Sequence, residues 1–245
     1  MSTPGAIVIP AVTKHTATVI LAHGLGDTGA GWAGIARNFR RRSKLDEVAF
    51  IFPNAPTIPI TINGGMRMPG WFDIRRLKNA TSVEDLSREE DEEGILRCRD
   101  YFHSLIRDET TNKGIPSERI VIGGFSQGGA ITLLSGVSCP TKLGGIFGLS
   151  SYLPLRDKLK DMIPSDNPNS NTKIFMAHGM EDPLVRYDWG IKTGEKLTEL
   201  GYTVDFRGYA CSGLDHSADV RELDHFENYL AEVLPPTKDD QLSEL

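Results

Sequence analysis

Residues 119–129 read Arg-Ile-Val-Ile-Gly-Gly-Phe-Ser-Gln-Gly-Gly, and this stretch decides the fold. An apolar run typical of a buried strand leads directly into a Gly-x-Ser-x-Gly turn, and a helix-forming stretch follows it. Gly124 and Gly128 leave the room that such a tight turn needs, because a β-carbon at either position would crowd it. The turn lifts the hydroxyl of Ser126 out of the chain and points the first helical amide, that of Gln127, at whatever the hydroxyl attacks. The motif therefore predicts an α/β fold in which Ser126 is a nucleophile.

The size and composition of the chain fit one α/β domain. It has 245 residues, of which 39% are hydrophobic and 24% charged. We expect a single domain over residues 1–245, with a packed core over about 7–234 and a disordered polar tail over 235–245. The formal net charge is −6, which gives no indication of a nucleic-acid partner.

Targeting signals and metal-binding patterns are not apparent in the sequence. No apolar run is long enough to cross a bilayer, and the first residues lack the pattern of a secretory signal. The three cysteines are odd in number and far apart, which is typical of a reduced compartment. We therefore expect a cytoplasmic protein, compatible also with the nucleus. No cluster of His and Cys has metal-ligand spacing, so we expect no metal and no cofactor.

Strand-like and helical patterns alternate along the chain, which favours a mostly parallel sheet covered by helices on both faces. The expected strands are short runs rich in Val, Ile and Phe, at 18–22, 48–52, 120–123, 145–149, 173–177 and 203–207, with another near 6–9. Helical periodicity predicts helices at 89–108, 127–137, 188–200 and 219–233.

Two segments do not follow this alternation. Residues 53–79 contain four prolines and many apolar side chains but no regular pattern. They are too apolar for a disordered loop, so we expect an irregular segment that packs on the core or lines a substrate cleft. Residues 89–93, Glu-Glu-Asp-Glu-Glu, open the next expected helix. We expect this acidic run to be a solvated first turn that the helix dipole favours.

A nucleophilic serine needs a base within hydrogen-bond reach and an acid that orients the base. In α/β-hydrolases the chain order is Ser, acid, His, each in a loop after a later strand. Glu181 and Asp182 both follow the expected strand at 173–177, and we favour Asp182 because Pro183 stiffens the loop just after it. His216 follows the last expected strand and is the expected base. The other histidines lie before the first strand, beside a strand or within helices: His15, His103, His178 and His225.

Residues 20–27, Ile-Leu-Ala-His-Gly-Leu-Gly-Asp, follow the first long strand. They match the His-Gly type of loop that gives a second backbone amide to an oxyanion hole. We expect Leu25 to be that donor and Gln127 to be the other. We expect His23 to hold the loop by hydrogen bonds rather than to transfer protons.

Taken together, these segments resemble the cytosolic acyl-protein thioesterase/lysophospholipase family of α/β-hydrolases. The resemblance covers about residues 7–236 and rests on motifs at 23–32, 52–56, 71–73, 123–129, 153–154, 182–185 and 216–217. It implies Ser126, Asp182 and His216 as the catalytic triad, with Leu25 and Gln127 at the oxyanion hole. It also implies a substrate-binding channel near Leu77, Tyr152 and Leu184, to which we add Trp71 from the apolar segment.

The same resemblance implies an activity and a class of partner. We expect a serine hydrolase that cleaves long-chain acyl thioesters from palmitoylated cysteines through an acyl-Ser126 intermediate. The alternatives are a carboxylesterase or lysophospholipase acting on small esters or lysolipids, and an acyl-ligand receptor without turnover. The expected partners are S-acylated proteins or acyl lipids, with transient contact to a membrane surface, and the chain is expected to be a monomer or weak homodimer.

The sequence departs from the family pattern at four places. Asp215 precedes the expected base, where the family more often has a small or neutral residue. Tyr152 stands where animal members tend to have Trp, and the segment 77–91 is longer than usual. Position 2 is Ser, so neither N-myristoylation nor acylation of a cysteine at that position is expected.

Overall fold

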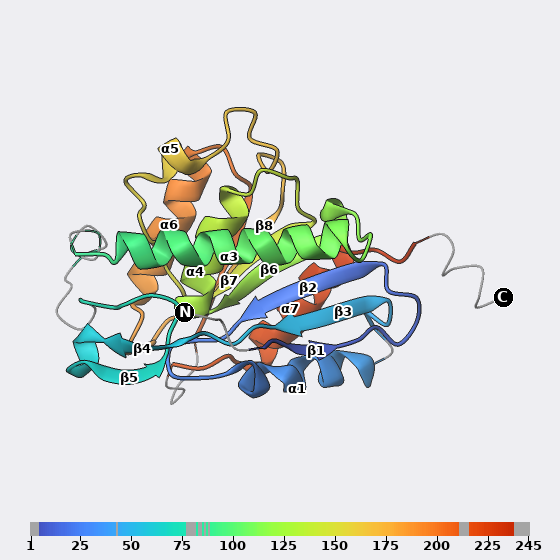
Figure 1. The fold of residues 1–245 in the computed structure, drawn as a ribbon, viewed down its shortest axis with the longest axis horizontal. Helices are drawn as coiled ribbons and strands as arrows, with labels where there is room; N and C mark the ends of the chain where they lie inside the picture. Colours follow the sequence, from blue (N-terminus) through green and yellow to red (C-terminus); the bar gives the residue numbers. More distant parts are fainter. Residues whose placement is uncertain are drawn as a thin grey trace.

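A mostly parallel sheet forms the centre of the protein, with helices on both of its faces (Figure 1). The computed structural model describes residues 5–42, 44–76, 82, 85, 87, 89–210 and 216–237. The described sheet has seven strands in the order β1-β3-β2-β6-β7-β8-β9. Only the β1–β3 pair is antiparallel among these neighbours. The expected α/β class and the mostly parallel sheet are thus confirmed.

The strands of this sheet lie within a few residues of the expected positions. They are β1 (Ile7–Ile9), β2 (Ala17–Ala22), β3 (Val48–Phe52), β6 (Ile120–Phe125), β7 (Gly145–Leu149), β8 (Ile174–Gly179) and β9 (Val204–Tyr209). Every residue of β2, β3, β6 and β7 is buried. Burial on both faces explains why these strands read as continuous apolar runs rather than as an alternating pattern.

Helices cover the two faces of the sheet separately (Figure 1). On one face lie α3 (Glu92–Thr111), α4 (Gln127–Val137) and α6 (Tyr187–Glu199), and on the other α1 (Gly29–Arg40) and α7 (Val220–Val233). Alternate residues of β2 serve the two cores, because Ile20 packs in the first cluster and Leu21 in the second. The short elements are η1 (Thr61–Asn63), η2 (Ser117–Arg119) and α5 (Leu159–Met162). No helix in the described part of the chain is both long and apolar enough to cross a membrane.

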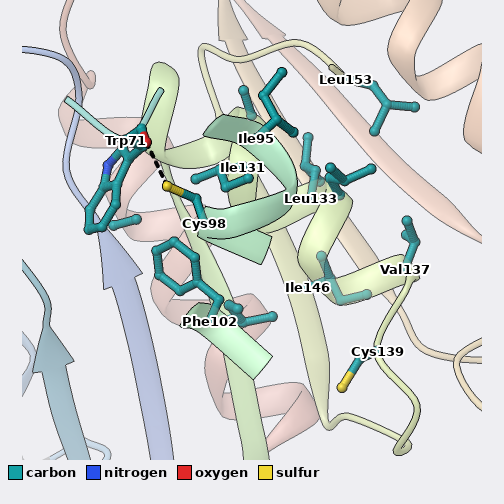
Figure 2. Packing of buried hydrophobic residues seen from close by; sticks show 14 of the residues in the cluster. Trp71, Ile95, Cys98, Phe102, Ile131, Leu133, Val137, Cys139, Ile146 and Leu153 are labelled. Atoms are coloured by element: carbon teal, nitrogen blue, oxygen red, sulfur yellow. Dashed lines mark hydrogen bonds between the residues drawn. The ribbon is translucent and has the colours of Figure 1, made fainter. Parts of the chain in front are cut away.

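The core beneath α3 is built around Trp71 (Figure 2). Its indole packs on Phe102 with ring centroids 5.0 Å apart. The thiol of Cys98 donates a hydrogen bond to the Trp71 carbonyl at 2.5 Å. Burial raises the pKa of Cys98 to about 12, so this thiol is a packing group rather than a nucleophile. Cys139 is also buried, and Cys211 lies outside the described residues.

The segment 53–79 is more regular than its sequence predicts. It contains an antiparallel hairpin of β4 (Thr57–Ile60) and β5 (Met66–Pro69). Ile58 and Ile60 are buried while their neighbours in β4 are exposed, which is the alternation of a strand with one solvated face. Gly64 and Gly65 have φ of 66° and 80° and supply the left-handed turn. Helix α1 is a second element that the sequence patterns did not predict.

The acidic run before α3 is only partly solvated, which corrects the expectation. Asp91 is the N-cap of α3 and its carboxylate accepts a hydrogen bond from the Gly94 amide at 3.2 Å. Glu90, however, turns toward the loop after β7, where each of its carboxylate oxygens lies 3.0 Å from the Leu155 amide. Burial raises the pKa of Glu90 to about 7, so this residue is not part of a solvated first turn.

Candidate active site

Ser126 lies at a strained turn between β6 and α4. Its φ of 53° and ψ of −122° are rare for a residue with a side chain. Its amide donates to the Leu149 carbonyl at 2.8 Å, which ties the turn to the neighbouring strand β7. A β-carbon would come within 2.4 Å of the Ala22 carbonyl oxygen at Gly124 and within 2.3 Å at Gly128. The close approach of the backbones therefore requires glycine at both positions, as the motif predicts.

Asp182 and His216 come together from the loops after β8 and β9. His216 Nδ1 lies 2.6 Å from Asp182 Oδ2. The other oxygen, Asp182 Oδ1, accepts hydrogen bonds from the amides of Leu184 and Val185, both at 2.9 Å. The side chains of Asp182 and His216 are 2% and 11% exposed. The carboxylate is thus fixed from one side and presents its second oxygen to the imidazole.

The charge on Asp182 results from opposing effects. Burial acts to raise the pKa of its carboxyl, but hydrogen bonding and charge attraction from His216 and the two loop amides outweigh burial and lower it. The carboxylate therefore stays ionised at neutral pH and keeps the proton of His216 on Nδ1. Glu181, the other candidate acid, is exposed and has no hydrogen bond or ion pair with His216 in the described part of the chain.

His216 and Ser126 line one cavity of about 660 Å³. The His216 ring packs on the ring of Phe125, the residue before Ser126, with centroids 4.6 Å apart. Its Nε2 atom is buried and has no hydrogen-bond partner among the described residues. A base with one nitrogen held by a carboxylate and the other unpaired can take the proton of a serine at the same cavity, and such contacts commonly tighten when substrate binds.

The two expected oxyanion donors flank Ser126. Leu25 lines the same cavity, and its amide has no acceptor in the part of the chain that the structure describes. Gly24, next to it, runs so close to the nucleophile that a β-carbon there would lie 3.4 Å from Ser126 Cβ. Gln127 is the first residue of α4, where helix amides have no partner within the helix. Both amides can therefore donate to an oxyanion that forms on the serine.

His23 holds the Leu25 loop, as expected from the sequence. Its ring is completely buried, and the amide of Ala55 donates to Nε2 at 3.0 Å. Nδ1 therefore carries the hydrogen, which it donates to the Gly24 carbonyl at 2.7 Å. Burial also lowers the pKa of His23, which keeps the ring neutral.

Apolar side chains from several segments complete the cavity wall. The segment 53–79 contributes Ile62, Met68 and Ile74, so it lies at the cavity that Ser126 and His216 line, and its role in binding substrate stays a prediction. Leu184, which is 45% exposed, lies on the same wall. Trp32 at the start of α1 also lines it and was not predicted as a contact, although it stands in the motif at 23–32.

The cavity wall, as far as the structure describes it, does not include Trp71 or Tyr152. Their side chains are only 1% and 6% exposed. Trp71 is packed under α3, and Tyr152 is packed against Trp189 of α6. In the structure both side chains pack in the core rather than on the described wall, and their contact with substrate stays a prediction. Leu77 and Asp215 lie outside the described residues.

The chain is similar to named relatives over nearly its whole length. It is 52% identical over 237 residues to acyl-protein thioesterase 1 of Aspergillus fumigatus, covering 96% of this chain and 95% of that protein. It is 53% identical over 241 residues to acyl-protein thioesterase 1 of Neurospora crassa, covering 98% and 96%.

Solved structures show the same fold. The crystal structure of Arabidopsis thaliana SOBER1 has a TM-score of 0.79 and 32% identity, covering 89% of this chain and 99% of that one. The crystal structure of Zea mays acyl-protein thioesterase 2 has a TM-score of 0.79 and 26% identity, covering 94% and 98%. The sequence profile of the phospholipase/carboxylesterase family matches residues 3–234. With this match and the arrangement of Ser126, Asp182 and His216, the chain belongs to the phospholipase/carboxylesterase family of α/β-hydrolases.

Proposed function

We propose that this protein is an acyl-protein thioesterase, a serine hydrolase that removes long-chain acyl groups from S-acylated cysteines. The observation that carries the proposal is the Asp182–His216 pair, joined at 2.6 Å, at the same apolar cavity as the strained Ser126 turn. The relatives of about 50% identity that bear the name acyl-protein thioesterase 1 support the choice of substrate.

The reaction follows from the placement of these groups. Ser126 Oγ attacks the thioester carbonyl while His216 Nε2 takes its proton, and Asp182 stabilises the imidazolium that forms. The amides of Leu25 and Gln127 donate to the oxyanion of the tetrahedral intermediate. The C–S bond then breaks, and His216 passes its proton to the departing cysteine sulfur, which is a good leaving group because the free pKa of a cysteine thiol is only about 8.5. Water, activated by His216, hydrolyses the acyl-Ser126 ester and releases the fatty acid.

The apolar wall of the cavity gives the acyl chain its binding energy. Burial of each methylene contributes roughly 0.8 kcal/mol. A chain that runs along Met68, Ile74 and Leu184 therefore gains affinity with length until the wall is covered. Acylated substrates are held at membranes by such chains, so the enzyme makes transient contact with a membrane surface and acts from the cytoplasmic side.

A carboxylesterase or lysophospholipase is the second candidate function, and the description of the matched family favours it. The same three side chains would serve an oxygen ester, so only the substrate decides. We would compare kcat/KM for a palmitoyl-cysteine peptide, lysophosphatidylcholine and a short nitrophenyl ester. The proposal predicts the highest value for the peptide, and a clear preference for either of the other two would replace it.

A chemical probe distinguishes a hydrolase from a receptor that binds acyl compounds without turnover. A fluorophosphonate reacts with a serine only when the base and the oxyanion donors are in place. We expect stoichiometric labelling of Ser126, and no labelling of Ser126→Ala. A folded wild-type protein that stays unlabelled would favour the receptor.

A further inference from the structure

We propose that the side chains of Gln127 and Trp71 form one positioning device that fixes the two oxyanion amides relative to each other. The proposal rests on the proposed function, in which the amides of Leu25 and Gln127 hold the oxyanion. Gln127 then has two separate roles. Its backbone amide touches the reacting oxygen, while its side chain positions that amide through a neighbour.

The Gln127 side chain is locked by two hydrogen bonds. It is 1% exposed although it stands at the first position of α4. Its Oε1 accepts from the Trp71 amide at 3.0 Å, and its Nε2 donates to the Phe72 carbonyl at 2.7 Å. Because the Trp71 amide can only donate and the Phe72 carbonyl can only accept, the orientation of the carboxamide is determined.

Trp71 joins this helix to the loop of the other donor. Its indole Nε1 donates to the His23 carbonyl at 2.8 Å, and the two rings lie 5.1 Å apart. His23 is two residues before Leu25 and is itself fixed by Ala55 and Gly24. Trp71 therefore donates two hydrogen bonds. Its amide donates to Gln127 at the start of α4, and its indole donates to His23 in the loop that carries Leu25.

Trp71, the bridging residue, is surrounded by buried side chains of α3. Figure 2 shows Trp71 among the buried side chains of α3, with Cys98 directed at its carbonyl oxygen and Phe102 against its ring. The ring of Tyr101 lies 6.3 Å from the indole. Its carbonyl and both of its N–H groups are hydrogen-bonded, so these bonds alone hold Trp71 in place and let it transmit a fixed spacing between the Leu25 loop and α4.

The device is needed because the sheet alone does not fix this spacing. Ala22 of β2 pairs with Gly124 of β6, but both chains leave the sheet before the donor amides are reached. An oxyanion donor works only at about 2.7–3.1 Å from the developing charge, and loss of one typically costs 10²–10³ in kcat. A displacement of about 1 Å can cost about 10²-fold. The hydrogen bonds of Gln127 and Trp71 connect the Leu25 loop to the start of α4 beyond Ala22 and Gly124, the last paired residues of β2 and β6.

A double-mutant cycle tests the proposal. Gln127→Met removes both side-chain hydrogen bonds with an unbranched residue of similar length, and Trp71→Phe removes the indole donor but keeps an aromatic ring. The readouts are the second-order rate constant for fluorophosphonate labelling of Ser126, and kcat and KM for a nitrophenyl ester. We expect each single variant to lower the labelling rate and kcat by about 10–100-fold with KM changed by less than about 3-fold. Because both act through one bridge, the double variant should be little worse than the more severe single variant.

A matched control removes packing from the same residue without touching the bridge. Phe102→Leu loosens the ring contact with Trp71, so it should lower Tm while the labelling rate stays within about 3-fold of the wild type. If Gln127→Met does not fold, Trp71→Phe alone must still lower the rate without changing KM.

Several results would overturn the proposal. Additive effects of the two substitutions, a change in KM instead of the rate, or a loss of rate in Phe102→Leu equal to that in Trp71→Phe each contradict a single device. A wild type that labels rapidly but does not cleave a palmitoyl-cysteine peptide would refute the substrate alone. A wild type that does not label at all would refute both the catalytic mechanism and the device.

Discussion

At the scale of single residues, Asp182 and His216 form the pair on which the proposed chemistry depends. The carboxylate has two tasks that its two oxygens divide. Oδ1 binds the loop amides of Leu184 and Val185, and Oδ2 binds His216 Nδ1 at 2.6 Å. The first contact fixes the loop, while the second fixes the tautomer that leaves Nε2 free for the serine proton.

Asp182→Asn separates these two tasks. The Asn oxygen can still accept from the loop amides, so we expect Tm to change by only a few degrees. The amide NH₂ would face His216 Nδ1 and favour the tautomer with hydrogen on Nε2, which cannot take the serine proton. We therefore expect kcat to fall about 10⁴-fold. A variant that keeps more than a tenth of wild-type kcat would show that Asp182 does not orient the base.

The sequence was sufficient to propose the residues of a triad but not to predict their surroundings. Ser126, Asp182 and His216 could be chosen because chain order and strand ends restrict an α/β-hydrolase to few candidates. The inward direction of Glu90 and of the Gln127 side chain could not be predicted, because both are polar residues at helix starts, where exposure is usual. Their partners, Leu155 and Trp71, are far away in the sequence and become neighbours only in the folded chain.

At the scale of elements, α4 packs its first turn directly on β2, and this contact depends on glycine. A β-carbon on Gly128 would lie 2.3 Å from the Ala22 carbonyl oxygen, which is a backbone atom and cannot move aside as a side chain could. Gly34 in α1 differs, because an added β-carbon would have nothing within 4 Å. The two glycines thus provide a matched pair within helices of the same protein.

We expect Gly128→Ala to destabilise the protein by about 1–3 kcal/mol or more and to abolish labelling of Ser126, since the turn must move. Gly34→Ala should stabilise it by up to about 1 kcal/mol and leave labelling unchanged, because alanine favours the helix. Tm and the fluorophosphonate rate constant measure the two effects. Equal shifts in Tm for the two variants would contradict the packing described for α4.

The start of α3 is tied to the loop after β7 through Glu90. The pKa of Glu90 is raised to about 7 by burial, with Asp157 and Glu92 adding repulsion and the Leu155 amide and Lys158 acting against it. A carboxyl whose folded pKa exceeds its unfolded value contributes stability below the unfolded pKa, and this contribution is lost as pH rises through the folded pKa. The window here lies between 4.5 and about 7.

Glu90→Gln can keep the hydrogen bond from Leu155 but cannot ionise. We therefore expect the variant to gain stability over the wild type as pH rises from about 4.5 to 7, by at most about 3 kcal/mol at about 1.4 kcal/mol per pKa unit. Denaturant unfolding of both proteins at several pH values measures the difference, from which other titrating groups cancel. A difference that does not change across this window would mean that Glu90 ionises at its ordinary pKa.

The elements that the sequence did not predict have weak local signals. Helix α1 contains three glycines within Gly29–Arg40, so its propensity is poor, and its helical form depends on burial of Ala33, Ala36 and Phe39. The β4–β5 hairpin contains prolines in both strands, which normally argue against a strand. Pro59 is tolerated because both strands of a two-stranded sheet are edge strands, where the missing N–H of proline need not interrupt a ladder.

At the scale of the whole molecule, the sheet order brings distant segments to one edge. Strands β2, β6, β8 and β9 are parallel, so the loops at their carboxyl ends, which carry Leu25, Ser126, Asp182 and His216, meet on the same side. The segment that contains the hairpin contributes Ile62, Met68 and Ile74 to the wall of the cavity at this edge. Part of the apolar wall therefore comes from a segment that carries none of the proposed catalytic groups.

Because Met68 belongs to a segment without proposed catalytic groups, a substitution there should change the chain-length preference without loss of chemistry. We expect kcat/KM for acyl-cysteine peptides to rise by up to about 4-fold per methylene, the equivalent of about 0.8 kcal/mol, and then to level off. Met68→Trp should make the plateau occur at a shorter chain, because Met68 lines the cavity. Met66→Trp is the control, since Met66 is 64% exposed and is not part of the described wall. A series with no dependence on chain length would contradict acyl binding in this cavity.

The most direct test of the catalytic centre is kcat/KM for a palmitoyl-cysteine peptide with the wild type and with Ser126→Ala, at matched Tm. With Ser126 as the attacking group, the loss should be at least about 10⁴-fold, leaving only what binding and the oxyanion donors supply. A folded Ser126→Ala variant that cleaves the peptide within about tenfold of the wild type would contradict it.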